Sequence, residues 1–321
     1  LAVNEYIGFA SDINVNTRSS ALNALAQSPS PLALPVLLKA AKAVLYRWEV
    51  SGATSALLNY AKNTGQNGDL KTMDKICKLV MAKCRDKLTI QNKTQALVTY
   101  VRFHGIDAMK ELKKAAENSD KTYRNAALRS SLAIPGKEIV SEWIAYFPKA
   151  IPEAKPEIIA MLGERGDESA LTLLTSSLAS TDQKVRSEAA AAMALINGAK
   201  AVPSLIEYMK NSAGQTDQEA VKTALMTVSG NKEIALLKPV LKEGSAAAKK
   251  SVIELMAWNR GNEYFKEVLP FTSSGDAFVI SAAYKALSSL SGPADQPDLI
   301  KLLSSAEDRN YISDLQTALA S

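Results

Sequence analysis

The sequence is poor in the residues that most often hold metal ions or build catalytic centres. Its 321 residues include one histidine and two cysteines. No His-Glu-x-x-His, Cys-x-x-Cys or Gly-x-Ser-x-Gly pattern occurs, and no Gly-x-x-x-x-Gly-Lys-Ser/Thr loop is present. These absences argue against a zinc centre, an α/β-hydrolase nucleophile and a P-loop. We therefore expect no catalytic residue, no cofactor and no metal ion in this chain.

Long apolar runs and an amino-terminal signal are also missing. The longest apolar run covers residues 189–196, far short of the roughly 18 residues that a bilayer span needs. The chain begins with Leu1, and neither a basic segment nor an apolar segment follows it. Either a leader has been removed, which favours a periplasmic or secreted location, or the chain is an excised piece. We expect no membrane span.

Aromatic residues are scarce, at 6%, while 47% of the chain is hydrophobic and 22% is charged. This is the composition of a folded chain, and its richness in Ala, Leu and Lys favours helices. The single histidine, His104, precedes Gly105 at the predicted end of a helix. We interpret it as a capping residue, because no nucleophile lies near it in the sequence.

The two cysteines fall on one predicted helix over residues 70–87. Cys77 and Cys84 would lie roughly 10.5 Å apart there, beyond the reach of about 7 Å that a disulfide allows. An apolar stripe of helical spacing includes both, and we expect the whole stripe to be buried. Its members are Met73, Cys77, Val80, Cys84 and Leu88.

Glycines divide the chain into repeats. Seven of the 15 glycines follow one another at spacings of 31, 30, 32, 32, 31 and 31 residues. Each follows a segment of helical apolar period, which predicts a left-handed glycine at the carboxyl end of a helix. The series is Gly105, Gly136, Gly166, Gly198, Gly230, Gly261 and Gly292.

A second signal falls inside each repeat, where aspartates stand at the predicted start of a new helix and can cap its free amides. They are Asp120, Asp182, Asp217, Asp276 and Asp308. Each repeat therefore reads as helix, turn, helix and glycine. We predict one continuous domain over 1–321, with irregular repeats in 1–104 and regular repeats of about 31 residues in 105–321, and about ten helix pairs in all.

Two segments carry a family resemblance. Asp182-Gln-Lys-Val-Arg-Ser-Glu-Ala-Ala-Ala-Ala-Met-Ala-Leu-Ile, followed by Gly198-Ala-Lys-Ala-Val-Pro-Ser-Leu-Ile-Glu-Tyr-Met, resembles HEAT repeats, in particular the HEAT-like class of phycobilisome lyases. The resemblance implies an all-α fold, an α-α superhelix or α-solenoid. It also implies kinked first helices, which suits the prolines in four of them, and a ladder of Asp–Arg pairs that Ile280 interrupts. The four prolines are Pro35, Pro203, Pro239 and Pro270.

The net charge of +5 is unevenly spread. Residues 1–160 carry 22 basic and 14 acidic residues, and residues 161–321 carry 16 and 19. Five cations recur near the start of the second helix of a repeat and form a candidate binding column: Arg124, Lys155, Arg186, Lys222 and Lys249. A column of this kind would bind a carboxylate-rich or phosphate-bearing partner; alternatively, each cation pairs with an acid of the neighbouring repeat. Trp258 is a further candidate contact for a peptide or carbohydrate, or a partly buried anchor.

These observations favour a non-catalytic scaffold that binds another macromolecule, most readily a protein, through its groove or ridge. Bacterial proteins of this kind often join such repeats to a further domain, so one alternative is an accessory region of a larger secreted or periplasmic enzyme, for example a sugar-hydrolase-like one. A second alternative is a nucleic-acid-binding protein similar to HEAT-like DNA glycosylases. The net charge of +8 in residues 71–129 favours it, but no aromatic residues are interleaved with the cations to stack on bases.

Overall fold

The structure, a computed structural model, describes residues 2–28, 30–212 and 214–320. These residues contain helices and turns and no β-strand. The chain forms two compact units, residues 1–161 and 162–321, and the boundary falls inside helix α10. Each unit consists of helix pairs, as the repeats predict. The expectation of one continuous domain stays a prediction.

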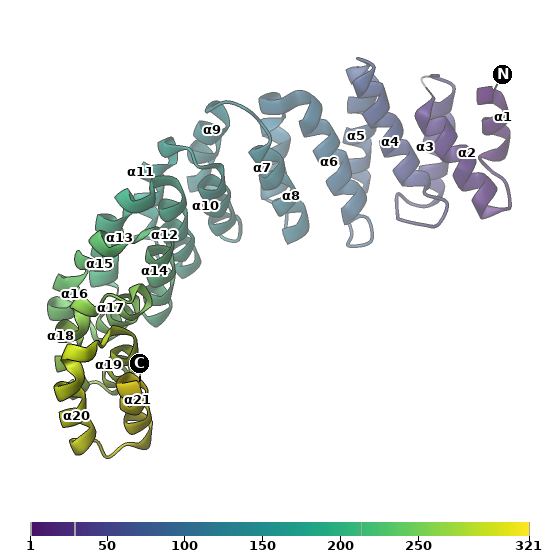
Figure 1. Cartoon of the computed structure of the whole chain (residues 1–321). Helices are drawn as coiled ribbons and strands as arrows, with labels where there is room; N and C mark the ends of the chain where they lie inside the picture. Colours follow the sequence, from purple (N-terminus) through teal and green to yellow (C-terminus); the bar gives the residue numbers. More distant parts are fainter. Residues whose placement is uncertain (1, 29, 213, 321) are drawn as a thin grey trace. The chain divides into compact units, whose positions relative to one another are not determined.

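The first unit is a row of helix hairpins (Figure 1). The second helices of successive pairs, α2, α4, α6 and α8, pack on one another, and a first helix packs beside each of them. The helices are α1 (Ala2–Phe9), α2 (Val15–Gln27), α3 (Ala33–Ala43), α4 (Ala53–Gln66), α5 (Leu70–Lys83), α6 (Ile90–His104), α7 (Met109–Ala116), α8 (Lys121–Leu132), α9 (Glu138–Tyr146) and α10 (Ala154–Arg165), whose last residues belong to the second unit.

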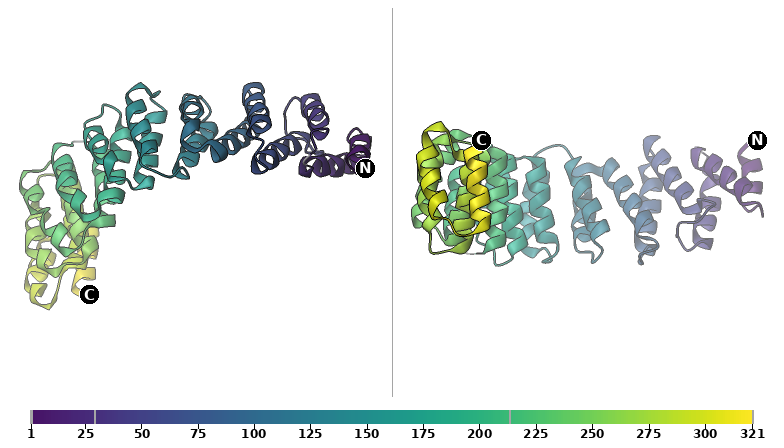
Figure 2. Two further views of the ribbon diagram at one scale, coloured as in Figure 1. Left: turned by 90° about the horizontal axis from the view of Figure 1, so that it is seen from above. Right: turned by 60° about the horizontal axis from the view of Figure 1, so that its bottom comes forward.

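The second unit repeats this arrangement, and Figure 2 shows its helix pairs from two further sides. Its second helices α12, α14, α17, α19 and α21 pack in sequence. Its helices are α11 (Leu171–Ser177), α12 (Gln183–Asn197), α13 (Val202–Asn211), α14 (Gln215–Val228), α15 (Asn231–Ala235), α16 (Lys238–Glu243), α17 (Ala246–Asn259), α18 (Phe265–Val268), α19 (Ala277–Leu290), α20 (Gln296–Ser305) and α21 (Arg309–Ala320). With α15 and α16 as two halves of one first helix, the described residues form the expected ten pairs.

Prolines interrupt two of the first helices because proline lacks the amide hydrogen that an interior turn needs. Pro203 is the second residue of α13, directly after a 3-10 turn over Gly198–Ala201. Pro239 is the second residue of α16, and the helix is broken between α15 and α16. Pro270 lies in a 3-10 turn over Leu269–Ser273. The predicted interruption of a first helix is present at Pro239 and Pro270. Pro35 and Pro203 instead lie in the first turns of α3 and α13, where proline is tolerated, and no break follows them.

Small residues bring the second helices close together. A Cβ atom built on Gly163 of α10 would lie 2.6 Å from the Cβ atom and 2.8 Å from the Cα atom of Ala192 in α12. Ala189, Ala190 and Ala192 are all buried in this layer. The alanine-rich second helices therefore stack at a distance that larger side chains would not allow.

The predicted aspartate caps are confirmed at Asp120, Asp182 and Asp276, whose side chains accept hydrogen bonds from the first amides of α8, α12 and α19. The prediction for Asp217 is wrong. Helix α14 starts after Gly214, which places Asp217 inside the first turn, and its side chain is buried.

The glycine series holds in part. Gly105, Gly136, Gly166 and Gly198 have positive φ angles of 53°, 91°, 75° and 54°. The prediction of a left-handed glycine is wrong for the last three members of the series. Gly230 and Gly292 instead begin the next first helix, where their amides donate to Glu233 and Asp295, and beside Gly261 the residue with φ of 54° is Arg260.

The stripe of the two cysteines also ends earlier than expected. Met73, Cys77, Val80 and Cys84 are fully buried and both thiols are free, as predicted. Leu88 is 65% exposed, so its assignment to the core is wrong. The reason is that α5 stops at Lys83, and Cys84 adopts an extended conformation that turns the chain away from the helical register.

One stretch of the described residues, 183–211, has the length and apolar composition of a membrane span. Half of its most apolar window is buried within the protein, and the stretch comprises two helices, α12 and α13, with the turn at Gly198 between them. We interpret these as core helices of the second unit.

Candidate binding surfaces

The candidate cation Arg124 is held at the start of α8. Asp120 caps this helix, and Arg124 follows four residues later, one helical turn along. Its Nε and Nη2 atoms donate to the two carboxylate oxygens of Glu157, each at 2.8 Å. Its Nη1 atom donates to the carbonyl oxygens of Asn118 and Ser119 at 2.9 and 3.0 Å. The side chain is buried, so it links two neighbouring second helices and satisfies the turn before its own helix.

Arg186 repeats this geometry in the second unit. It follows the cap Asp182 by four residues, and its Nη2 and Nε atoms donate to the Asp217 carboxylate at 2.8 and 3.2 Å. Its Nη1 atom donates to the carbonyl oxygens of Ser180 and Thr181. The hydrogen bonds to Asp217 raise the pKa of Arg186, so the guanidinium is cationic throughout the physiological range.

In the next second helix, α14, two residues share the contacts that a single arginine makes in α8 and α12. Gln218 occupies the fourth position after the cap Gly214, and its amide Nε2 atom donates to the carbonyl oxygens of Met209 and Ser212 at 2.7 and 2.6 Å. The ionic contact moves one turn along the helix to Lys222, which pairs with Glu254 at 2.5 Å. Lys222 also contacts Glu219 at 2.6 Å. Lys250 pairs with Glu254 and Glu219 as well, so four charged groups form one network.

The remaining candidates are placed differently. The ammonium group of Lys155 lies 5.7 Å from the centre of the Phe147 ring. Lys249 is half-buried and has no ion-pair partner within the described ranges. Trp258 is 45% exposed near the end of α17. For Arg124, Arg186 and Lys222 the structure therefore shows the contacts that the alternative interpretation describes: each cation pairs with an acid of the neighbouring repeat.

A second series of ion pairs joins the first helices, and sequence analysis missed it. Each pair joins a lysine to an acid about one repeat, 29 to 33 residues, further along. A search for lysine and acid at this spacing could have found them. The pairs are Lys113–Glu142 at 2.6 Å, Lys210–Glu243 at 3.6 Å, Lys238–Glu267 and Lys266–Asp298. All four are more exposed than the Arg124–Glu157 pair, so they contribute less to stability.

The Arg186–Asp217 pair borders a cleft in the second unit. The cleft has a volume of about 770 Å³ and lies between the carboxyl-terminal part of α11 and the length of α13. Leu178 and Pro203 provide apolar lining, and Ser204, Glu207 and Asn211 provide polar lining. Glu207 and Asn211 are exposed, and the Asn211 amide donates to the Glu207 carboxylate at 2.8 Å. The cleft thus combines an apolar wall with an acidic rim.

Tyr208 stands in the wall of this cleft. Its hydroxyl group is buried and has no hydrogen-bond partner in the part of the chain that the structure describes. Burial raises the pKa of Tyr208, and the nearby Asp217 carboxylate acts in the same direction. The phenol is therefore neutral and supplies the cleft with an aromatic face rather than a charge.

The side chains of the described residues that most often take part in catalysis are His104, Cys77 and Cys84 and the acidic residues. The described residues contain no group of three or more His, Cys, Asp and Glu side chains placed to hold a metal ion. His104 ends α6 and contacts Asp74 of α5 at 2.5 Å, while its ring lies 4.3 Å from that of Tyr100. Burial raises the pKa of Cys77 to about 12 and that of Cys84 to about 11, so both thiols are protonated and weak nucleophiles at neutral pH.

Comparison with known proteins identifies a repeat type in one part of the chain and similar folds. Residues 140–226 match the sequence profile of HEAT repeats. No curated protein has a significantly similar sequence. The crystal structure of Kap121p is similar with a TM-score of 0.59 and 11% identity, covering 98% of this chain and 41% of that one. The structure of the karyopherin Kap121p bound to the extreme C-terminus of the protein phosphatase Cdc14p has a TM-score of 0.58 and 11% identity, covering 99% of this chain and 41% of that one.

The chain therefore spans less than half the length of Kap121p. The CpcE–CpcF complex of the phycocyanin lyase from Nostoc sp. is also similar, at 17% identity, with 66% of this chain and 94% of that one covered, but the TM-score is only 0.35. The finer resemblance to the lyase class stays a prediction. The profile match identifies HEAT repeats in residues 140–226, and the helix pairs of the described residues have the fold of an α-solenoid.

Proposed function

We propose that this protein is a non-catalytic scaffold whose second unit binds an extended segment of a partner protein in the cleft between α11 and α13. The cleft itself carries the proposal: it has a volume of about 770 Å³, and the bidentate Arg186–Asp217 pair is part of its lining. A pre-formed cleft of this size, with an apolar wall and few polar groups, is typical of a site that receives one or two side chains. The structure of Kap121p with the C-terminus of Cdc14p is an example of the fold binding a segment of another protein.

The charges at the rim of the cleft indicate which side chains the bound partner segment should carry. Glu207 is exposed and has no basic partner among the described residues, whereas the Asp217 charge is neutralised by Arg186. We therefore expect an apolar side chain that packs against Leu178 and Pro203, with a lysine or arginine beside it to meet Glu207. The proposal of a partner-binding cation column at Lys155 and Lys249 remains open beside this one.

Selection from a random peptide library displayed on phage tests the proposal. Peptides enriched on the intact chain should contain an apolar residue next to a basic one. Their affinity, measured by calorimetry, should fall at least tenfold for Ser204→Trp, which fills the cleft, and for Glu207→Lys, which reverses the rim charge. Glu307→Lys makes the same charge change on an exposed residue at a distance and should leave the affinity unchanged. Enriched peptides that bind Ser204→Trp as tightly as the parent would exclude the cleft.

A further inference from the structure

Four large apolar side chains of the first unit stand in solvent on two loops. Leu45, Trp48 and Val50 are 64%, 74% and 71% exposed on the loop between α3 and α4. Leu88 is 65% exposed on the loop between α5 and α6. We call these four residues the loop patch. Exposed apolar side chains scattered singly are ordinary, but four on adjacent turns point to a contact surface.

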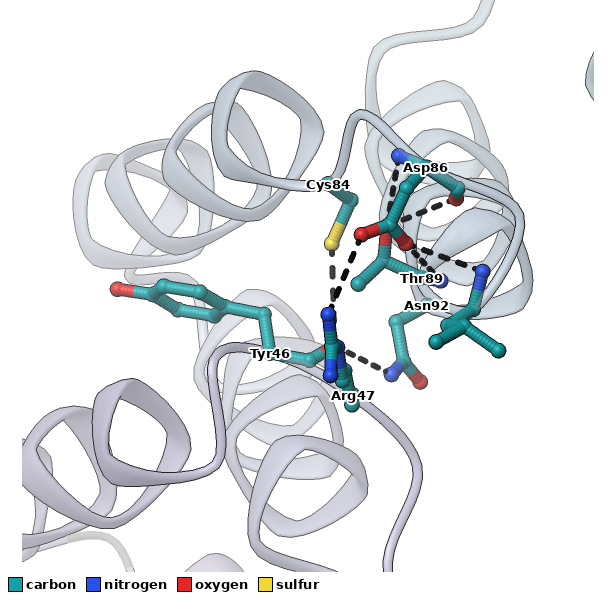
Figure 3. A network of polar contacts seen from close by, with 7 residues as sticks. Tyr46, Arg47, Cys84, Asp86, Thr89 and Asn92 are labelled. Atoms are coloured by element: carbon teal, nitrogen blue, oxygen red, sulfur yellow. Dashed lines mark hydrogen bonds and ion pairs between the residues drawn. The ribbon is translucent and has the colours of Figure 1, made fainter.

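The two loops are tied to each other. The Arg47 guanidinium lies 3.7 Å from the Asp86 carboxylate, and the Asn92 amide donates to the carbonyl oxygen of Tyr46 at 2.8 Å (Figure 3). The Cys84 thiol lies 4.0 Å from the same carbonyl oxygen. Contacts between residues far apart in the sequence therefore hold both loops in one arrangement.

The backbone of the first loop adopts an unusual conformation. Leu45 and Tyr46 have positive φ angles of 54° and 57°, which non-glycine residues seldom adopt. The Tyr46 side chain is buried, while its neighbours Leu45 and Arg47 are exposed. Strain of this kind persists where the surroundings fix it, and it is common at functional sites. Here it anchors Tyr46 in the core while the apolar residues beside it stand in solvent.

Basic residues flank the loop patch in the sequence, and the acids of the two loops accept hydrogen bonds from backbone amides. Glu49 accepts hydrogen bonds from the amides of Ser51 and Ala53, and Asp86 accepts them from the amides of Leu88 and Thr89. These hydrogen bonds hold the pKa of both carboxyl groups below their ordinary values. The exposed basic residues on the same helix ends and loops are Lys42, Lys83, Arg85 and Lys87.

We propose that the loop patch binds the surface of an anionic phospholipid bilayer. Tryptophan and leucine side chains would enter the boundary between headgroups and acyl chains, while Lys42, Lys83 and Lys87 meet lipid phosphates and carboxylates. Tryptophan favours this boundary because its ring is apolar and its indole nitrogen is a hydrogen-bond donor.

The shape of the loop patch favours a lipid surface over a protein. Side chains that are 64% to 74% exposed project from turns rather than line a groove, and a fluid surface closes around each of them without a matching shape. The neighbouring turn between α1 and α2 adds Ile13, which is 99% exposed, and Figure 1 shows these three turns at the same end of the helices. The exposed apolar side chains of these three turns can thus contact one flat surface at the same time.

Flotation of the intact chain with vesicles tests the proposal. We expect the chain to float with equimolar phosphatidylcholine and phosphatidylserine, to remain behind with phosphatidylcholine alone, and to dissociate as salt is added. Trp48→Ala should weaken binding on the order of tenfold. Neutralising Lys42, Lys83 and Lys87 to Gln should weaken it roughly a hundredfold, since each basic residue at an anionic surface contributes roughly fivefold.

Matched variants separate the loop patch from general charge. Neutralising Lys232, Lys242 and Lys301, three exposed lysines of the second unit, changes the net charge equally and should leave flotation unchanged. Trp258→Ala removes an exposed tryptophan of the second unit and should leave flotation unchanged as well. In the parent chain, tryptophan fluorescence should shift to shorter wavelength on anionic vesicles, and Trp48→Phe should abolish this shift while the chain still floats.

Three results would overturn the proposal. The first is no flotation with anionic vesicles under any salt condition. The second is equal loss of binding in the two lysine triples, which would assign it to net charge. The third is binding of soluble poly-glutamate, with the same dependence on Lys42, Lys83 and Lys87 but without flotation, which would assign the loop patch to an acidic protein segment. None of these results bears on the cleft of the second unit.

Discussion

At the scale of the residue, one position decides how neighbouring repeats are joined. The fourth residue after the helix cap is Arg in α8 and α12, Gln in α14 and Ile in α19. Arg both pairs with the next helix and satisfies the preceding turn, whereas Gln218 does only the latter. Ile280 does neither, so the ladder is interrupted there, at the position where the sequence departs from the HEAT pattern.

Removing the buried Arg124 tests this role. Arg124→Met leaves the Glu157 carboxylate and two turn carbonyl groups without their partner, and we expect it to lower the free energy of unfolding by about 3 kcal/mol. Lys210→Met breaks the exposed Lys210–Glu243 pair and should cost less than about 1 kcal/mol. Urea denaturation measures both. Equal losses would contradict the distinction between the two series of ion pairs.

The Asp86 carboxyl group makes stability depend on pH. Hydrogen bonds from Thr89, with the Arg47 charge as a smaller cause, hold its pKa below its ordinary value of 3.8. A carboxyl group with a lowered pKa in the folded state stabilises the fold above its unfolded pKa, and this contribution is lost as the pH falls through the folded pKa. We therefore expect the denaturation midpoint to fall below about pH 4, and to fall less steeply in Asp86→Asn. Glu307→Gln, at an exposed site, should follow the parent curve.

At the scale of the element, the helix ends show what could be predicted from sequence. Aspartate caps and prolines act within one turn, and their effects are predicted correctly at Asp182 and Pro239. The spacing of Asp217 suits a cap, but α14 begins after Gly214, and the partner of Asp217, Arg186, lies in another helix. The cleft and the loop patch could not be predicted, because both depend on loop geometry and on contacts between segments distant in sequence.

Two glycines at turns between helices should respond oppositely to substitution. Gly198 ends α12 with φ of 54°, so Gly198→Ala forces an alanine into a disfavoured conformation and should cost about 1–2 kcal/mol. Gly275 has no positive φ, and a Cβ atom built on it meets nothing within 4 Å. Gly275→Ala should therefore raise the stability, by up to about 1 kcal/mol, because it restricts the unfolded chain. Thermal unfolding in which both variants are destabilised alike would contradict the assignment of the conformations.

At the scale of the whole molecule, charge divides along the chain, and the two proposed binding surfaces follow this division. Residues 1–160 have an excess of eight basic residues, and residues 161–321 an excess of three acidic ones. The proposed lipid-binding loop patch belongs to the first unit, and the cleft with its acidic rim belongs to the second. Each surface thus has the charge that its proposed partner requires, an anionic bilayer for the first and a segment with a basic side chain for the second. A scaffold of this kind would hold a partner protein at a membrane.

Because each helix pair contacts only its neighbours, damage to one pair should stay local. Helix α14 packs against α12, α13 and α17, and Leu225 is fully buried in it. Leu225→Ala should cost about 2–5 kcal/mol. Since the stability of repeat proteins is a sum over repeats and their interfaces, we expect faster amide hydrogen exchange from α12 to α17 and unchanged exchange from α2 to α6. Leu57→Ala removes another fully buried leucine, in α4, and should speed exchange from α2 to α6 while leaving exchange from α12 to α17 unchanged. Exchange that rises evenly along the chain in both variants, followed by mass spectrometry of peptides, would mean that all repeats unfold as one cooperative unit and that nearest-neighbour contacts do not describe this solenoid.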